Sequence, residues 1–154
     1  MTVDANFLSP LNFIFTINKM PKANMMVQRA SIPGVNLGDI QIPTPFTPLA
    51  VPGNVKYDPL MIDFLINEDL STYLEIFNWM VELGNPYDFS TYDSTEYDAR
   101  LLVLDNSKRN ILDVSFHSTF PVSLSPVNFD TTFLEPSPIT ATVMFSFNSM
   151  KFNT

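Results

Sequence analysis

The chain has 154 residues, enough for one domain with a substantial core, and no cysteine, which excludes disulfides, zinc–thiolate sites and thiol nucleophiles. Charged residues make up only 16% of it, against ~25% in an ordinary globular domain, while 45% of it is apolar. Either Ser, Thr and Asn cover such a surface, or part of the surface is buried against other subunits. The net charge of −8 argues against a protein that grips nucleic acid, because that grip depends on Lys and Arg neutralising phosphates.

Strand patterns dominate the chain, and no apolar run approaches the ~18 residues of a membrane span. The chain does not begin with a basic stretch and an apolar core, so we expect no secretory signal and a soluble protein that matures in the cytoplasm. Segments 110–120 and 139–148 alternate apolar and polar residues and predict half-buried strands, with a hairpin turn at 105–110 before the first. Shorter candidate strands are 13–18, 25–32, 55–67, 101–105 and 127–133.

A long proline-rich segment, 33–57, follows the second candidate strand. Prolines at this density exclude a central strand and favour an extended chain. Apolar side chains stand between the prolines, which argues against disorder, since those side chains require burial. We therefore expect an arm that packs on another molecule, with an arm folded back on its own domain as the alternative. The residues expected at that inter-subunit contact are Ile40, Ile42, Phe46 and Leu49.

One helix is predicted over 68–83, with Asn67 as N-cap, two acids in its first turn and Gly84 as its stop. A helix resting on one sheet needs an apolar stripe of only ~100°, but this helix is apolar over more of its circumference. It is therefore either sunk in its own core or placed between its own sheet and a neighbouring subunit, and we favour the neighbour. The candidate inter-subunit residues on the helix are Ile76, Trp79 and Leu83.

An acidic loop is predicted over 84–99, where the pair Tyr-Asp recurs every five residues, at 87, 92 and 97. Its carboxylates do not have the spacing of a calcium-binding loop. A solvated loop, or an acidic patch that faces a basic partner, is the preferred interpretation.

Residues suited to catalysis are scarce. His117 is the only histidine and lies on the polar side of the strand predicted at 110–120, so we expect a solvated side chain. The four glycines match neither a dinucleotide-binding nor a phosphate-binding loop, and no serine stands in a Gly-x-Ser-x-Gly turn. We therefore expect no enzyme activity, no cofactor and no metal site.

Several segments occur in a recognisable order along nearly the whole chain. They are NFIFTIN, ASIPG, the proline-rich arm, KYDPLMIDFLINEDLSTYLEIFNWM, a hairpin, STFPVSLSPVNFD and TATVMFSFN. The most specific part is the strand-into-helix block, with Tyr57-Asp58-Pro59 at its start and Trp79 near its end. The corner Ser31-Ile32-Pro33-Gly34 and the step Phe120-Pro121 add to it. In this order the features resemble the tail tube proteins of contractile-tailed bacteriophages, a family that includes baseplate tube initiators.

The resemblance implies a mainly β fold: an antiparallel β-sandwich or barrel in a single domain over 1–154, with one flanking helix and a long extended arm. It implies six copies that close a ring around a lumen, and rings that stack into a tube conducting phage DNA without specific binding. The implied partners are further copies, tail sheath and baseplate proteins, with no membrane, and the implied location is the virion tail after assembly in the host cytoplasm. The lumen candidates are Asp113, Ser115, Asp130, Thr140 and Thr142.

Two alternatives to a repeating tube subunit stay open. One is a baseplate tube-initiator or hub protein of the same fold. The other is a monomeric β-sandwich module that binds through the tyrosines of the acidic loop, because tyrosines in loops are effective contact residues.

Overall fold

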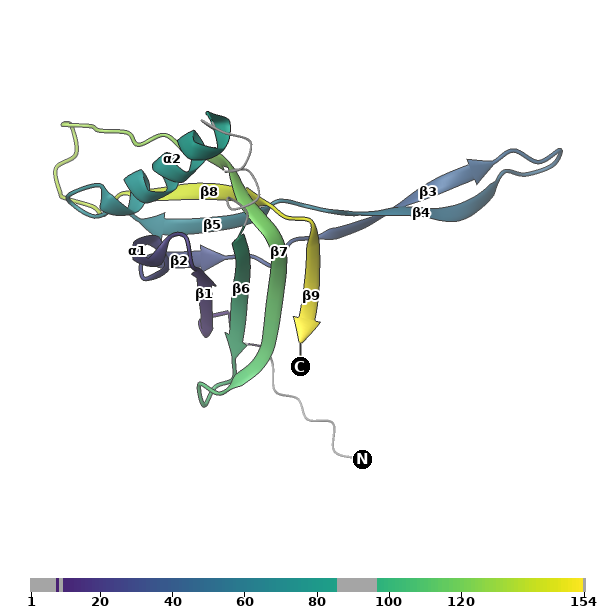
Figure 1. The fold of residues 1–154 in the computed structure, drawn as a ribbon, viewed down its shortest axis with the longest axis horizontal. Helices are drawn as coiled ribbons and strands as arrows, with labels where there is room; N and C mark the ends of the chain where they lie inside the picture. The colour runs from purple at the N-terminus through teal and green to yellow at the C-terminus, as the bar shows by residue number, and fades with distance from the viewer. Residues whose placement is uncertain (1–7, 9, 86–96, 154) are drawn as a thin grey trace.

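The computed structural model describes residues 8, 10–85 and 97–153 and has a β-rich body from which a two-stranded arm projects (Figure 1). Its strands, in chain order, are β1 (Phe13–Ile17), β2 (Val27–Ala30), β3 (Val35–Ile42), β4 (Leu49–Tyr57), β5 (Leu60–Leu65), β6 (Tyr97–Leu104), β7 (Asn110–Leu124), β8 (Thr140–Ser146) and β9 (Ser149–Asn153). The helices are α1 (Pro21–Asn24) and α2 (Ser71–Gly84). Every strand pair is antiparallel, so the fold class predicted from the sequence is confirmed.

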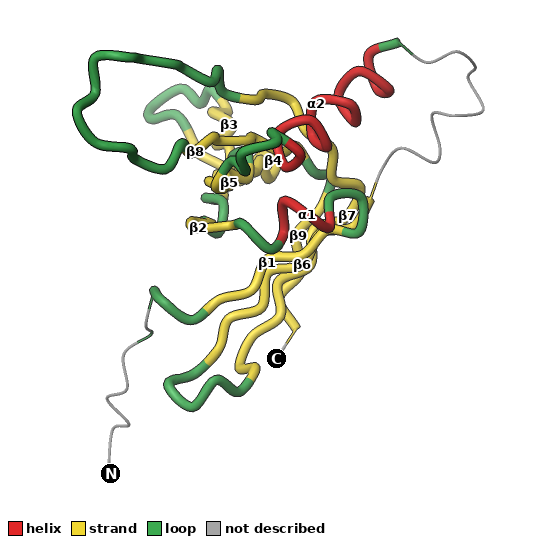
Figure 2. The backbone as a smooth tube through the Cα atoms, turned by 90° about the vertical axis from the view of Figure 1, so that its left-hand side faces the viewer, coloured by secondary structure: helices red, strands yellow, loops and turns green. Residues whose placement is uncertain are grey.

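The body is one seven-stranded sheet folded into two wings, because the long strand β7 belongs to both. Wing A consists of β1, β6, the first part of β7, and β9; wing B consists of β2, β5, β8 and the last part of β7. Figure 2 views the two wings from a second direction, with the strands of wing A running together below wing B. The faces of the two wings that point toward each other form the inner side of the body. The arm, formed by β3 and β4, is a separate two-stranded sheet.

The change of direction within β7 occurs at Ser118. This residue has φ of 55°, in the left-handed region, and the pairing of β7 with β6 shifts register here, from Ala99↔Phe116 to Tyr97↔Thr119. A bulge of this kind inserts an extra residue and bends the strand. The alternation predicted for 110–120 would place Thr119 on the polar side, but beyond the bulge its side chain is fully buried.

The core lies between the inner faces of the two wings. Alternate residues of each strand point inward, as the period-two pattern of 139–148 predicts: Ala141, Val143 and Phe145 of β8 are all buried. The rings of Phe15 from wing A and Phe145 from wing B meet across the core, with centroids 6.3 Å apart. The helix α2 adds a further aromatic side chain, because the ring of Trp79 lies 6.0 Å from that of Phe145.

The helix α2 begins three residues later than predicted, and Asn67 is not its N-cap. Residues 67–70 instead form a turn in which the backbone N–H of Leu70 donates to the carbonyl oxygen of Asn67 (3.0 Å). Leu70 itself has φ of 58°, and Asp69 Oδ1 accepts a hydrogen bond from the backbone N–H of Ser71 (3.1 Å). The same hydrogen bond lowers the pKa of Asp69. The carboxylate of Asp69, rather than the predicted N-cap Asn67, therefore accepts a backbone N–H of the first turn of α2.

The loop predictions have different outcomes. The turn at 105–110 is confirmed, since Asp105 Oδ1 accepts backbone N–H groups from Ser107 and Arg109, both at 2.8 Å, between β6 and β7. The candidate strand at 127–133 is wrong: residues 125–139 contain no strand, and prolines at 126, 136 and 138 deprive this segment of backbone donors. The predicted acidic loop is shortened because β6 begins at Tyr97, and residues 86–96 lie outside the described part of the chain.

Candidate assembly surfaces

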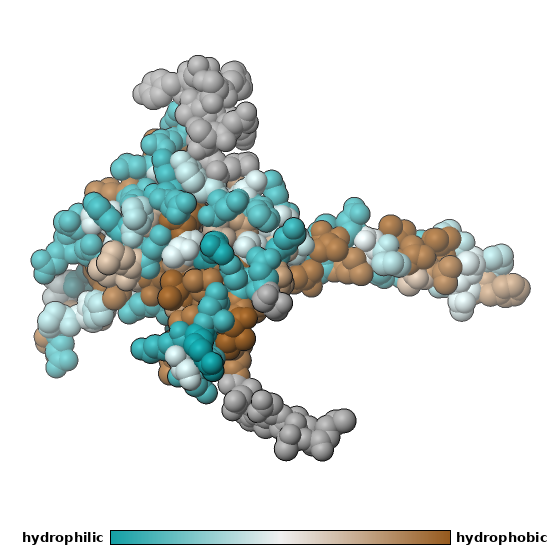
Figure 3. All heavy atoms as spheres, turned by 60° about the horizontal axis from the view of Figure 1, so that its bottom comes forward, coloured by the Kyte–Doolittle hydropathy of each residue, from teal (hydrophilic) through white to brown (hydrophobic). Residues whose placement is uncertain are grey.

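The arm has no packing partner within the described part of the chain. Every residue of β3 is exposed, and Phe46 at the tip is 96% exposed. No charged residue lies between Asp39 and Lys56, and Figure 3 shows apolar residues along much of the arm. An isolated two-stranded ribbon is at best marginally stable in water. The segment is extended, as the prolines predict, but its strands pair with each other, and its apolar surface remains open.

The arm presents apolar side chains on both of its faces. Near its tip, Ile40 pairs with Val51 and Ile42 pairs with Leu49, so these four side chains share one face, here called the tip face. Near its root, Val35 and Leu37 stand on the other face of β3, because side chains alternate along a strand. The two apolar faces are separated by a register shift between Leu37 and Asp39. A partner that covers only one side of the ribbon would leave half of this surface in water.

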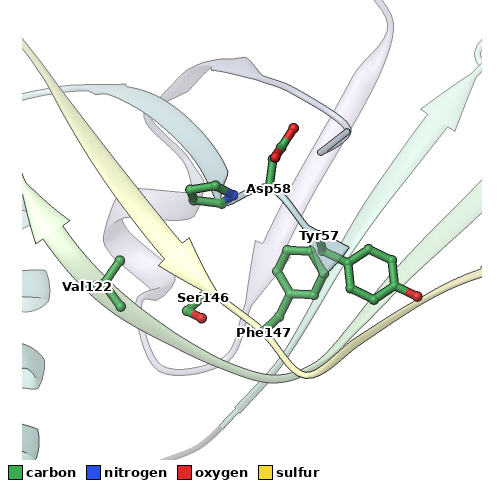
Figure 4. A pocket seen from close by; sticks show the side chains of 6 residues that line it. Tyr57, Asp58, Val122, Ser146 and Phe147 are labelled. Carbon is green, nitrogen blue, oxygen red and sulfur yellow. The ribbon is translucent and has the colours of Figure 1, made fainter. Parts of the chain in front are cut away.

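Asp58 joins the two strands of the arm at its root. Its backbone N–H donates to the carbonyl oxygen of Gly34 (3.0 Å), and its Oδ1 accepts from Asn36 Nδ2 (3.0 Å). A Cβ on Gly34 would stand 2.5 Å from Asp58 Oδ2, so any larger residue here would displace that carboxylate. The ring of Tyr57 also packs on that of Phe147, with centroids 5.5 Å apart. Figure 4 shows the two rings at the mouth of a shallow cavity of about 200 Å³, lined also by Pro59, Val122 and Ser146.

The helix α2 has two apolar faces, and the residues predicted to contact a neighbouring subunit lie on its inner face. Ile76 and Trp79 are 0% and 1% exposed in the single chain, so their side chains belong to the subunit's own core. Leu83, the third predicted contact, is partly buried and packs against the same core. The opposite face carries an exposed row, here called the helix stripe. Its residues are Leu74, Phe77 and Val81.

The outer face of wing A carries paired polar side chains beside the apolar Ile14 and Leu102. Asp113 forms an ion pair with Arg100, and this hydrogen bond raises the pKa of the guanidinium. His117 lies on the polar side of β7, where Nδ1 stands 3.5 Å from Asp98 Oδ2. Ser115 Oγ accepts a hydrogen bond from Asn153 Nδ2 (3.2 Å). This face carries charges of both signs, from Asp98, Arg100, Asp113 and Lys151.

The five lumen candidates do not lie together. Asp113 and Ser115 are on the outer face of wing A, whereas Thr140 and Thr142 are on the outer face of wing B, where Thr142 Oγ1 bonds Asp63 Oδ1 (2.6 Å). Asp130 is in the loop 125–139, where the hydroxyl and backbone N–H of Thr132 bond its carboxylate and lower its pKa. The sequence pattern identifies outward-facing residues, but the bend in β7 sends them in different directions. One lumen wall therefore cannot contain all five.

Two further features were not singled out by the sequence. The loop 125–139 exposes Phe129, Phe133 and Leu134, the last of them completely. It also borders two open grooves of about 380 and 520 Å³, and Ile66 and Leu70 line the larger one. Wing A has β1 and β9 as its outer strands, and no described strand pairs with their outer edges. Unpaired edges are templates for strand pairing between molecules. The signal for the loop was available in its prolines, but the edges follow only from the sheet order.

Within the described residues, no helix is long and apolar enough to cross a membrane. The same part of the chain has no cluster of three or more His, Asp or Glu residues able to hold a metal ion. The features that stand out are surfaces, namely the arm, the helix stripe, the sheet edges and the apolar loop.

Comparison with known proteins gives one sequence relative and several structures with the same fold. The chain is 28% identical over 141 residues to the tail tube terminator protein of Enterobacteria phage T4, across 82% of this chain and 78% of the relative. No protein-family model matches the chain.

Among solved structures, the tube-terminating cap of the anti-feeding prophage has a TM-score of 0.75 at 13% identity, covering 100% of this chain and 95% of that one. A chain from the sheath–tube complex of an extracellular contractile injection system, PVC, has a TM-score of 0.74 at 11% identity, with 97% and 93% covered. The fold is therefore that of the tube-type proteins of contractile injection systems. The chain thus shares the fold of these tube and cap proteins and is similar in sequence to a phage tail tube terminator.

Proposed function

We propose that this protein is a non-enzymatic, ring-forming subunit of a contractile tail tube and that it occupies the terminal ring of the tube. The observation that carries the terminal position is the sequence relationship to a tail tube terminator across 82% of this chain. The likeness in fold to a tube-terminating cap shows that this fold also occurs at the end of a tube, which supports the proposal. A repeating tube subunit, the first expectation from the sequence, is the second candidate, and the fold shared with a sheath–tube complex favours it.

The ring is proposed to close through the surfaces that the single chain leaves open. The outer edges of β1 and β9 allow wing A to continue from one copy to the next by strand pairing. We expect six copies in the ring, with the polar face of wing A on the lumen side. On this face Arg100 is paired with Asp113, so a passing DNA would meet few free cations and would not be retained. Tail tube, sheath and baseplate proteins are the proposed partners.

The decisive experiment is negative-stain microscopy of the purified protein, alone and after addition to tubes grown from the cognate tube subunit. A terminator gives single rings or rings only at tube ends, and tubes stop growing once it is bound. Long tubes formed by this protein alone would instead identify the repeating subunit. Binding only at the end where a tube is nucleated on the baseplate would identify the initiator.

The matched control for that experiment is a variant whose body folds but whose arm cannot pack. Ile42→Glu places a charge in the tip face without touching the core, so its body should unfold like that of the wild type while rings are lost. A wild-type protein that stays monomeric at high concentration and never binds tubes would exclude a ring subunit, and would favour the monomeric binding module.

A further inference from the structure

The tip face of the arm needs a receiving surface, and the arm points away from the body. Figure 1 shows β3 and β4 leaving the side of the body opposite to the start of α2 and the loop 125–139. The seven residue steps from Val35 to Ile42 give a reach of about 23 Å beyond the root. At the root, the ring contact between Tyr57 and Phe147 joins the arm to the body. The surface that receives the tip therefore belongs to another molecule.

Charge distinguishes the available receiving surfaces. The tip face is uncharged, so it loses nothing to desolvation when it packs on another uncharged surface. Burying a carboxylate beneath it without a partner would be costly. The loop 125–139 and its grooves are bordered by Glu68, Asp130 and Glu135, all exposed, and the tip offers them no cation.

The helix stripe meets this requirement. The only charged residues in α2 are Glu75 and Glu82, and both are engaged within the chain. Glu75 Oε2 accepts the backbone N–H of Ala23 (3.1 Å), and Glu82 Oε2 pairs with Lys19 Nζ (3.0 Å). Leu74, Phe77 and Val81 are spaced at three and four residues, so they form one row about 10 Å long. The two cross-strand pairs of the tip face are about 7 Å apart along the ribbon, so both fit within the length of this row.

We propose that the tip face of one copy packs on the helix stripe of a neighbouring copy. This inference rests on the proposed ring-forming function and names the two surfaces that meet. Because the donor and receiver are different patches of the same chain, the contact is heterologous and repeats from copy to copy until the ring closes. The root face of the arm, with Val35 and Leu37, then lies on the opposite side of the ribbon and remains available to a second molecule.

The absence of cysteine makes a direct test possible by disulfide trapping. The test protein is Ile42→Cys combined with Phe77→Cys, oxidised after assembly and run on a denaturing gel. We expect a ladder of covalent oligomers up to the full ring, whereas either single variant gives dimers at most. The matched control pairs Ile42→Cys with Leu134→Cys in the competing apolar loop, and it should give no ladder. A ladder from the Leu134 pair alone would overturn the proposal.

A second measurement does not depend on cross-linking. Ile42→Glu and Phe77→Lys, both at positions exposed in the single chain, should each reduce ring formation at least tenfold at a fixed concentration. The double variant should recover most of it, because the two new charges meet. Loss without recovery, in proteins whose unfolding matches the wild type, would refute this pairing while wild-type rings still upheld the proposed function. Absence of wild-type rings, free or on tubes, would refute the proposed function itself.

Discussion

In the body, apolar side chains alternate toward a shared core, whereas in the arm strands of similar composition have no core behind them. Phe64 and Phe145 are fully buried within one chain, while Ile40 and Leu49 are more than half exposed. The body therefore has its own source of stability, whereas the arm leaves its apolar surface exposed in the single chain. The comparison shows that an apolar pattern predicts burial without indicating whether the covering surface belongs to the same chain. The experiments below test that division between body and arm.

The largest expected effect is in the body, at Trp79. Trp79→Ala removes a fully buried ring that packs on Phe145 and Tyr97, and it should lower the free energy of unfolding of the isolated subunit by about 3–5 kcal/mol. Urea denaturation of the monomer measures it. Phe77→Ala, two residues earlier on the outer side of the same helix, is the matched control and should change this value by less than about 0.5 kcal/mol. Similar losses of unfolding free energy in both variants would contradict the assignment of Trp79 to the core-facing side of α2 and of Phe77 to its outer side.

The second prediction concerns the arm, where substitutions should impair assembly without lowering the stability of the subunit. The double variant Ile40→Ser/Ile42→Ser removes two apolar side chains from the tip face and should abolish rings, while the free energy of unfolding stays within about 0.5 kcal/mol of wild type. Sedimentation velocity and urea denaturation report the two quantities. Gln41→Ser, on the opposite face between the same residues, should assemble normally. A drop in monomer stability comparable to that of a core substitution would show that the arm packs on its own body.

A smaller effect is expected at the root of the arm. Gly34→Ala introduces a Cβ that would stand 2.5 Å from Asp58 Oδ2, so the carboxylate must move and its bond with Asn36 is strained. We expect a several-fold rise in the concentration needed for ring formation, with little change in unfolding. The control is Gly84→Ala, where a Cβ meets nothing within 4 Å. Normal assembly of Gly34→Ala would mean that the arm needs no fixed root.

The smallest effect concerns pH and the hairpin between β6 and β7. Hydrogen bonds from the backbone of Arg109 and Ser107 lower the pKa of Asp105 from its ordinary 3.8. A depressed pKa contributes stability that is fully present above pH 3.8 and is lost as the pH falls through the lower folded-state value. The urea midpoint of the wild type should therefore fall more steeply in this acid range than that of Asp105→Asn. Parallel profiles would show that this carboxylate is not coupled to folding.

The sequence predicted the elements whose signals are local. The alternation from Thr140 to Ser146, the turn begun by Asp105 and the extended form of the proline-rich segment were all predictable, because each depends on neighbouring residues. The side of α2 that faces the core was not readable. Ile76 and Phe77 are both apolar, so periodicity shows that each face favours burial but does not assign either face to the subunit's own core.

The candidate lumen residues were misjudged for a different reason. Alternation correctly identified Asp113 and Thr142 as outward-facing, but which way a residue faces in space depends on the whole sheet. Ser118, at the bend, has a left-handed backbone conformation, and a serine within a strand pattern gives no sequence signal that the strand bends there. The relation between the two wings therefore required the structure.

The pairing of β7 and β5 with the last strands also determines when this protein becomes able to fold. Residues 140–146 fill the gap in wing B between β5 and β7, and β9 completes wing A, so neither wing is whole until this part of the nascent chain has left the ribosome. Contacts so distant in sequence form slowly. During synthesis the arm, with its uncharged tip, emerges before the last strands of the body, and at that stage the growing chain is prone to aggregation. The complete body, with both wings closed, therefore forms only once the final strands are in place.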